Sequence, residues 1–193
     1  MRTILIVTVG GSHQPILRSI QQNQPDYVCF LCSGDTQKAK GSYIQVDGQG
    51  NVLKSSPTLE SPDQPNIVTL AGLARDSYEV IRISNFDNLN ECYLSAAETI
   101  DRLRTKWPDA EIIVDYTGGT KSMTAGLAAA ALDDGRCGIQ VVTGIRADLN
   151  KVTDQTEFVR PISVWDAQVR RRLTLVHALL AQYQYAAASR LLE

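Results

Sequence analysis

The fold is decided near the start of the chain by residues 3–12, which read TILIVTVGGS. Seven consecutive apolar or β-branched residues are typical of a buried strand, and the paired glycines end it. A helix then begins near Gln14, with Pro15 in its first turn, and residues 26–32 form a second apolar strand. Strand, helix and strand at this spacing predict a βαβ unit with parallel strands.

The same alternation continues along the chain. Further strands are expected at residues 78–83, 110–115 and 137–143, with an edge strand at 157–162. An Ala-rich helix runs to Leu132, and an amphipathic helix ended by Pro108 carries one apolar face, made of Leu89, Tyr93, Ala96, Ile100, Leu103 and Trp107. The sequence therefore predicts an α/β fold: a Rossmann-like, mostly parallel sheet with helices on both faces.

Two regions depart from this pattern. Residues 43–47 and 51–53 flank Gly48-Gln49-Gly50, which predicts a small β-hairpin, and the proline-rich residues 55–65 indicate a surface loop. From Asp166 the composition becomes helical and stays so to Glu193, with no cap or breaker at the end. We expect a domain at residues 1–165, a helical linker or start of a further domain at 166–193, and an effector beyond Glu193.

Composition limits the class of partner. The chain has 193 residues, 44% hydrophobic, with a formal net charge of −2. Binding to duplex nucleic acid is dominated by phosphate neutralisation and usually needs a basic face, so we expect no duplex partner. A short anion held by backbone amides is compatible with this charge. No run approaches the roughly 18 apolar residues of a membrane span and no signal peptide is recognisable, so we expect a cytoplasmic protein without a membrane partner.

Cys29 and Cys32 form a C-x-x-C pair within an apolar strand. Side chains three residues apart along a strand point to opposite faces, so the two thiols do not share a tetrahedral metal without a local turn. We interpret them as buried structural cysteines. No metal and no cofactor are expected.

Two turns carry the candidate chemistry, residues 10–13 after the first strand and residues 117–122 after a later central one. Paired glycines let the backbone approach a ligand closely, and each following helix offers free N–H groups and a positive dipole end to an anion. Hydroxyls and one cation add further donors, from Ser12, Thr117, Thr120, Ser122 and Lys121. In an open parallel sheet, ligands bind beyond the carboxyl ends of the strands.

The alternative for each turn is a tight connection without a ligand. The second turn is no P-loop, because Thr120 separates Gly119 from Lys121 and position 114 is Val. No G-x-G-x-x-G dinucleotide fingerprint is present either. The turns thus indicate phosphate binding of a less common kind.

Residues 4–11 and 112–123 together resemble the CARF family, Rossmann-like sensors of type III CRISPR defence. The match is strongest at residues 114–123, which read VDYTGGTKSM, and the resemblance covers about residues 1–165. Residues 183–192 are similar to the helical segment that joins the sensor to an effector in the family's ancillary ribonucleases.

The resemblance implies a homodimer that binds cyclic tetra- or hexa-adenylate across its two-fold axis, with the tetramer favoured. Such a ring contains a two-fold axis, as does the dimer, so each protomer grips half of it. The residues that would line the ligand are Thr8, Gly10, Gly11, Ser12 and His13 from one turn, and Thr117, Gly118, Gly119, Thr120, Lys121 and Ser122 from the other.

Some members of the family also cut their ligand, and whether this chain does so stays open. The ribose 2′-OH attacks the adjacent phosphorus, so no metal is needed. Lys121 would stabilise the transition state, Ser12 or Thr120 would position the phosphate, and His13 is a further acid–base candidate. This would make the chain a metal-independent ring nuclease.

Two other possibilities have to be weighed. Arg172 and His177 match the R-x4-H spacing of HEPN ribonucleases, but Leu173 replaces the usual polar residue and only 16 residues follow, so we interpret them as surface residues of a helix. The rival function is a small α/β enzyme that uses Lys121 and Ser12 on a mononucleotide or phosphorylated metabolite. A dimerisation module with vestigial turns is the third alternative.

Overall fold

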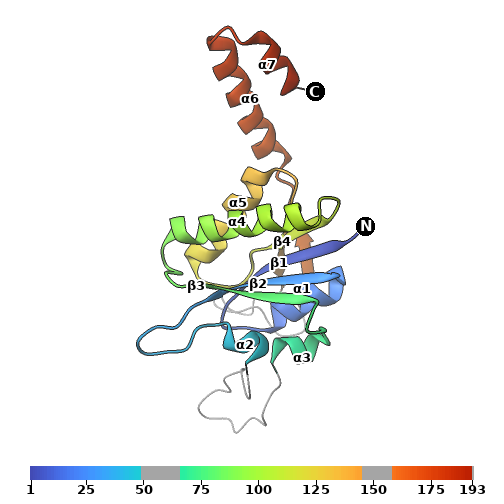
Figure 1. Cartoon of the computed structure of the whole chain (residues 1–193), viewed down its shortest axis with the longest axis vertical. Coiled ribbons are helices and arrows are strands. Elements are labelled where there is room, and N and C mark those ends of the chain that lie inside the picture. Colours follow the sequence, from blue (N-terminus) through green and yellow to red (C-terminus); the bar gives the residue numbers. More distant parts are fainter. Residues whose placement is uncertain (49–65, 145–157, 193) are drawn as a thin grey trace. The chain divides into compact units, whose positions relative to one another are not determined.

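A computed structural model describes residues 1–48, 66–144 and 158–192 of the chain. It divides into two units, Met1–Ile162 and Ser163–Glu193 (Figure 1). The elements of the first unit are β1 (Thr3–Val9), α1 (Gln14–Asn23), β2 (Tyr27–Ser33), α2 (Ile44–Asp47), α3 (Ile67–Ala71), β3 (Tyr78–Ile83), α4 (Leu89–Lys106), β4 (Glu111–Asp115), α5 (Lys121–Asp134), β5 (Gly138–Thr143) and β6 (Phe158–Pro161).

The described strands form one sheet in the order β3-β2-β1-β4-β5-β6. All neighbours are parallel except β5 and β6, which are antiparallel. The chain moves outward from β1 to β2 and β3, returns to the centre at β4, and then moves outward on the other side. The strand order therefore reverses between β1 and β4, which is the place where open α/β sheets bind ligands. The predicted Rossmann-like class, the βαβ start and the edge strand are confirmed.

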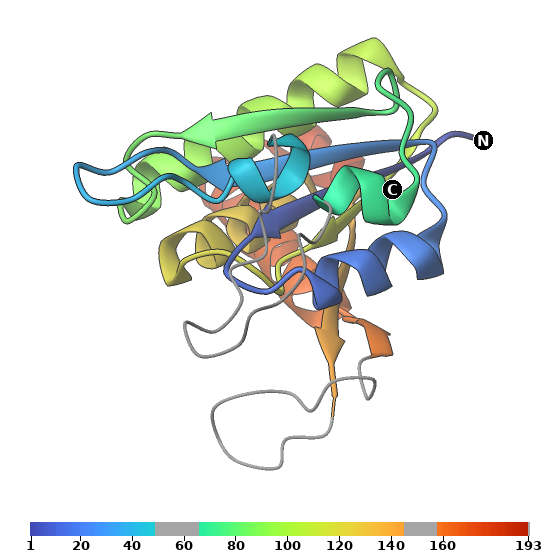
Figure 2. The ribbon, with the colours of Figure 1, turned by 90° about the horizontal axis from the view of Figure 1, so that it is seen from below.

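Helices cover both faces of the sheet. Figures 1 and 2 show α4 and α5 on one face and α1, α2 and α3 on the other. Successive strand residues point to opposite faces, and both sets are buried here because both faces are covered. The core on the α1 face joins buried residues of β1 and β2 to those helices, among them Val7, Phe30, Ile16, Val46 and Ile67.

The amphipathic helix predicted from the 4-3 spacing is α4. Asn88 caps its start, the side chain accepting a hydrogen bond from the Glu91 amide. The centre of the predicted face is buried, with Ala96, Ile100 and Leu103 each at 1% exposure or less. Leu89 is 54% exposed, because it lies in the first turn beyond the edge of the core.

The predicted hairpin is wrong for residues 43–47, while residues 49–53 and the predicted loop at 55–65 lie outside the described residues. Residues 44–47 form the short helix α2, started by a hydrogen bond from the Gln45 amide to the Ser42 carbonyl. Val46 is fully buried in the core beside α3. Ile44 and Val46 suggested period-2 alternation, but so short a run does not distinguish a strand from a helical turn.

The second unit contains α6 (Trp165–Ala181) and α7 (Tyr185–Arg190). Both are helical, as predicted from the composition of residues 166–193, and Val176 and Ala188 are buried. Arg172 and His177 are exposed residues of α6. Among the described helices, none is long and apolar enough to cross a membrane.

Candidate functional site

The two glycine-rich turns lie side by side. β1 and β4 are paired in parallel, with Val7 opposite Asp115, so both strands end at the same edge of the sheet. α1 follows the first turn on one face and α5 follows the second turn on the other. Two helix starts therefore flank the point where the strand order reverses.

The glycines allow the two turns to touch each other. A Cβ atom on Gly10 would lie 2.6 Å from the Gly119 nitrogen, and one on Gly118 would lie 2.5 Å from the Thr8 carbonyl oxygen. Gly119 has a φ of +89°, a conformation that favours glycine. The Thr8 hydroxyl, which is buried, donates to the Gly118 carbonyl. The glycines were predicted to let the backbone approach a ligand closely, and in the structure they let one turn approach the other. Thr8, the predicted ligand residue, bonds to the second turn instead.

The second turn is fixed by its own hydroxyls. Thr120 is the N-cap of α5, and its side chain accepts a hydrogen bond from the Met123 amide. The same hydroxyl donates to the Phe86 carbonyl over 2.7 Å, and Ser122 donates to the Asp87 carbonyl over 2.7 Å. Both bonds tie the start of α5 to the loop before α4.

Thr117 is held from the other side. Its hydroxyl and its amide both donate to Asp115 Oδ1, and the hydroxyl accepts from the Val142 amide of β5. Asp115 is buried, and its second oxygen accepts a hydrogen bond from Gln140, which also donates to Ser19 of α1. A polar network beneath the sheet edge therefore positions the second turn, and sequence reasoning missed it.

The first turn is more open. Gly11 and Ser12 are exposed, and a Cβ atom on Gly11 would meet nothing within 4 Å. His13 is the half-buried N-cap of α1 and makes no side-chain capping bond. Lys121, the first residue of α5, is also exposed. Ser12 and Lys121 are thus accessible to solvent at the starts of the two helices.

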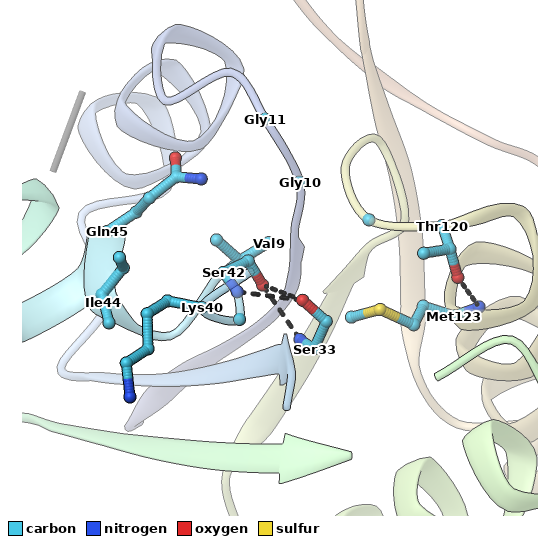
Figure 3. A pocket seen from close by; sticks show the side chains of 12 residues that line it. Val9, Gly10, Gly11, Ser33, Lys40, Ser42, Ile44, Gln45, Thr120 and Met123 are labelled. Atoms are coloured by element: carbon cyan, nitrogen blue, oxygen red, sulfur yellow. Dashed lines mark hydrogen bonds between the residues drawn. The ribbon is translucent and has the colours of Figure 1, made fainter. Parts of the chain in front are cut away.

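A cavity of about 430 Å³ opens between the turns (Figure 3). Four predicted residues line it: Gly10, Gly11, Gly119 and Thr120. The other seven do not, and these are Thr8, Ser12, His13, Thr117, Gly118, Lys121 and Ser122. The predicted set thus contains residues that line the cavity, residues such as Thr8, Thr117 and Ser122 whose hydroxyls bond within the protein, and exposed donors such as Ser12 and Lys121.

Eight of the twelve residues that line the cavity are outside the predicted set, and six of them come from the end of β2 and the segment that follows. These residues are Ser33, Lys40, Gly41, Ser42, Ile44 and Gln45; we call them the β2 wall. Two reciprocal hydrogen bonds of 2.9 Å, from each backbone amide to the other's hydroxyl, join Ser33 to Ser42. The signal available in the sequence was Ser33-Gly34 directly after an apolar strand, followed by Gly41-Ser42.

Lys40 adds a second cation to the site. Its ammonium group lies 3.2 Å from Asp35 Oδ2, and this hydrogen bond raises the pKa of Lys40. The pKa of Asp35 is lowered, first by the Gly41 amide and also by Tyr43 and Lys40. Both side chains are exposed, so the ion pair is weak and Lys40, which lines the cavity, can leave Asp35 for a bound anion at little cost.

The cysteines are free and buried, as predicted. Burial raises the pKa of Cys29 and of Cys32, which keeps both thiols protonated and unreactive. Among the described residues, no group of three or more His, Cys, Asp or Glu side chains is placed to hold a metal ion.

Several solved structures are similar to this chain. Enterococcus italicus Csm6 bound to cyclic hexa-2′-fluoro-hexa-dAMP matches with a TM-score of 0.68 and 16% identity, over 98% of this chain and 49% of Csm6. Protein VC1899 from Vibrio cholerae matches at 0.50 and 10%, over 73% and 30%. A type III CRISPR defence DNA nuclease activated by cyclic oligoadenylate matches at 0.50 and 15%, over 75% and 19%.

These similarities confirm the fold that the resemblance to CARF sensors implies. The chain spans about half the length of Csm6 and less of the other two. No family model matches the sequence, and no curated protein matches it.

Proposed function

We propose that this chain is a CARF-type sensor domain that binds cyclic oligoadenylate and regulates a type III CRISPR effector. The observation that carries the proposal is the meeting of two glycine-rich helix starts at the strand reversal, over a cavity of about 430 Å³. Backbone amides at helix starts bind phosphate oxygens without a basic surface, which agrees with a net charge of −2.

The similar structures support this ligand class. Csm6, which matches over nearly the whole chain, is bound to a cyclic hexanucleotide analogue, and the DNA nuclease is activated by cyclic oligoadenylate. We favour the tetramer as the ligand in this proposal, and the hexamer is the second ligand to be compared.

The binding unit in this proposal is a homodimer. A cavity of about 430 Å³ is in the size range of pockets for drug-sized ligands, and it suits part of a nucleotide ring better than a whole one. A two-fold dimer supplies two such cavities and two copies of Lys121 to one ring. Residues 1–165 then form the sensor and residues 166–193 lead toward the effector.

Ligand cleavage is a separate question in which Lys121 and Ser12 have the main roles. Thr120 is better suited to support than to chemistry, because its hydroxyl already bonds to Phe86 and to the Met123 amide. Incubation with the ring and chromatography of the products, in the presence of a chelator, distinguishes a ring nuclease from a sensor that only binds.

Calorimetric titration with cyclic tetra- and hexa-adenylate tests the proposal. We expect one ring per two chains, with the same dimer seen by light scattering. Lys121→Ala should weaken binding about tenfold or more, because it removes a charged partner of phosphate. Lys106→Ala is the matched control, because it also removes one lysine charge. Lys106 is the last residue of α4, does not line the cavity, and contacts Trp107.

Other outcomes would contradict the proposal. Binding of AMP or another mononucleotide as tight as that of the rings, with one site per chain, would favour the small-metabolite enzyme. Binding of neither would indicate a dimerisation module with vestigial turns. If Lys121→Ala and Lys106→Ala bind the ring with equal affinity, Lys121 does not contact the ligand.

A further inference from the structure

Gln45 carries a buried polar atom without a partner. Its side-chain oxygen Oε1 is inaccessible to solvent and makes no hydrogen bond within the described structure. Gln45 also lines the cavity between the turns. Buried acceptors of this kind are uncommon, because the lost hydration is not replaced, and each one calls for an explanation such as a bound water or ion or a functional role.

The backbone of Gln45 is well fixed. Its amide donates to the Ser42 carbonyl over 3.0 Å, and Ser42 is joined to the end of β2 through Ser33. The next residue, Val46, is fully buried in the core. The carboxamide is therefore presented from a supported position and not from a free loop.

Apolar groups lie on either side of the same cavity. Figure 3 shows Ile44, Gln45 and Lys40 on one side of Ser33, and Thr120 and Met123 on the other. The Met123 side chain is buried against the second turn, near Gly119. A polar group that can both donate and accept, set beside Ile44 and across the cavity from Met123, suits a flat heterocycle better than a phosphate.

We propose that Gln45 recognises the base of the ligand, while the two helix starts hold its phosphates. This inference rests on the proposed function. On binding, the carboxamide turns into the cavity, where its oxygen accepts from the exocyclic amino group of adenine and its nitrogen donates to the adjacent ring nitrogen, the pairing that suits Gln and Asn to adenine. Ile44 and Met123 pack against the ring faces. The β2 wall thus supplies base specificity, which neither glycine-rich turn provides.

The test exchanges the hydrogen-bonding pattern at this position. Gln45→Glu presents only acceptors, which match the two neighbouring donors on the edge of guanine and oppose the ring acceptor of adenine. Affinity for the cyclic oligoadenylate that the wild type binds should fall about tenfold or more, and the preference over the guanylate ring of equal size should shrink or reverse.

Gln45→Leu is the second variant. It removes the orphaned acceptor, so the midpoint of thermal unfolding should stay the same or rise, while the preference for adenylate over guanylate should fall. Gln21→Leu is the matched control, because Gln21 is exposed on α1 and does not line the cavity. It should leave both affinities unchanged.

Wild-type binding with an unchanged adenylate-to-guanylate ratio in Gln45→Glu and Gln45→Leu would overturn this inference and leave the proposed function standing. Failure of the wild type to bind any ring would overturn both. If Gln45→Glu does not fold, the adenylate-to-guanylate affinity ratio of Gln45→Leu decides whether the inference stands.

Discussion

The turn after β1 and the turn after β4 both contain two glycines followed by a hydroxyl residue, Gly10-Gly11-Ser12 and Gly118-Gly119-Thr120. Their hydrogen bonding differs. In the second turn, the hydroxyls of Thr117, Thr120 and Ser122 all bond to other parts of the protein. In the first turn, Gly11 and Ser12 are exposed at the start of α1. The second turn is a fixed platform, and the first presents its groups to solvent.

This comparison shows that a hydroxyl in a glycine-rich turn is not automatically a ligand donor. The three hydroxyls of the second turn were predicted to line the ligand because hydroxyls bind phosphate oxygens. In the structure they position the backbone amides and the start of α5, leaving Lys121 exposed. Preorganised amides lose little freedom on binding, so a rigid platform favours affinity even where its side chains do not touch the ligand.

The largest expected effect comes from breaking the contact between the turns. Gly10→Ala places a methyl group 2.6 Å from the Gly119 nitrogen, and we expect a loss of about 3 kcal/mol in the free energy of unfolding. Gly11→Ala is the control, because a Cβ atom there meets nothing within 4 Å. Urea denaturation of both variants measures the difference, and equal stabilities would show that the turns do not touch.

A smaller effect is expected from unlocking the second turn. Thr120→Ala removes the cap of α5 and the bond to Phe86, which should cost about 1–2 kcal/mol in unfolding free energy. Ring affinity should fall as well, because the amides of the turn are no longer held. Thr105→Ala removes a threonine that bonds only within α4, and it should be nearly neutral; an equal loss in both variants would refute the locked platform.

The smallest effect on stability is expected in the first turn. Ser12→Ala should change the free energy of unfolding by less than about 0.5 kcal/mol, because Ser12 is exposed. Calorimetry should nevertheless show weaker binding of the ring. A Ser12→Ala chain as destabilised as Thr120→Ala would mean that both turns are locked, and the comparison would fail.

The sheet could be predicted from the sequence because each strand is a short apolar run between turn residues. Residues 3–9 and 78–83 were placed within their final bounds, and the strand reversal brings the two predicted turns together. The hydroxyl partners of the second turn could not be predicted, because Phe86 and Asp87 lie 34 and 35 residues away from the residues that they bind. Ile44 and Gln45 of the β2 wall were missed because residues 44–47 form a helix of only four residues, too short to show a period.

The central claim is that both turns hold one ligand together, and amide chemical shifts test it most directly. Cyclic tetra-adenylate, and separately the hexamer, would be added to isotopically labelled protein while the backbone amides of Gly10, Gly11, Gly119 and Lys121 are followed. The account predicts that signals of both turns shift together and saturate at one ring per two chains. Shifts confined to one turn, or to neither, would contradict it.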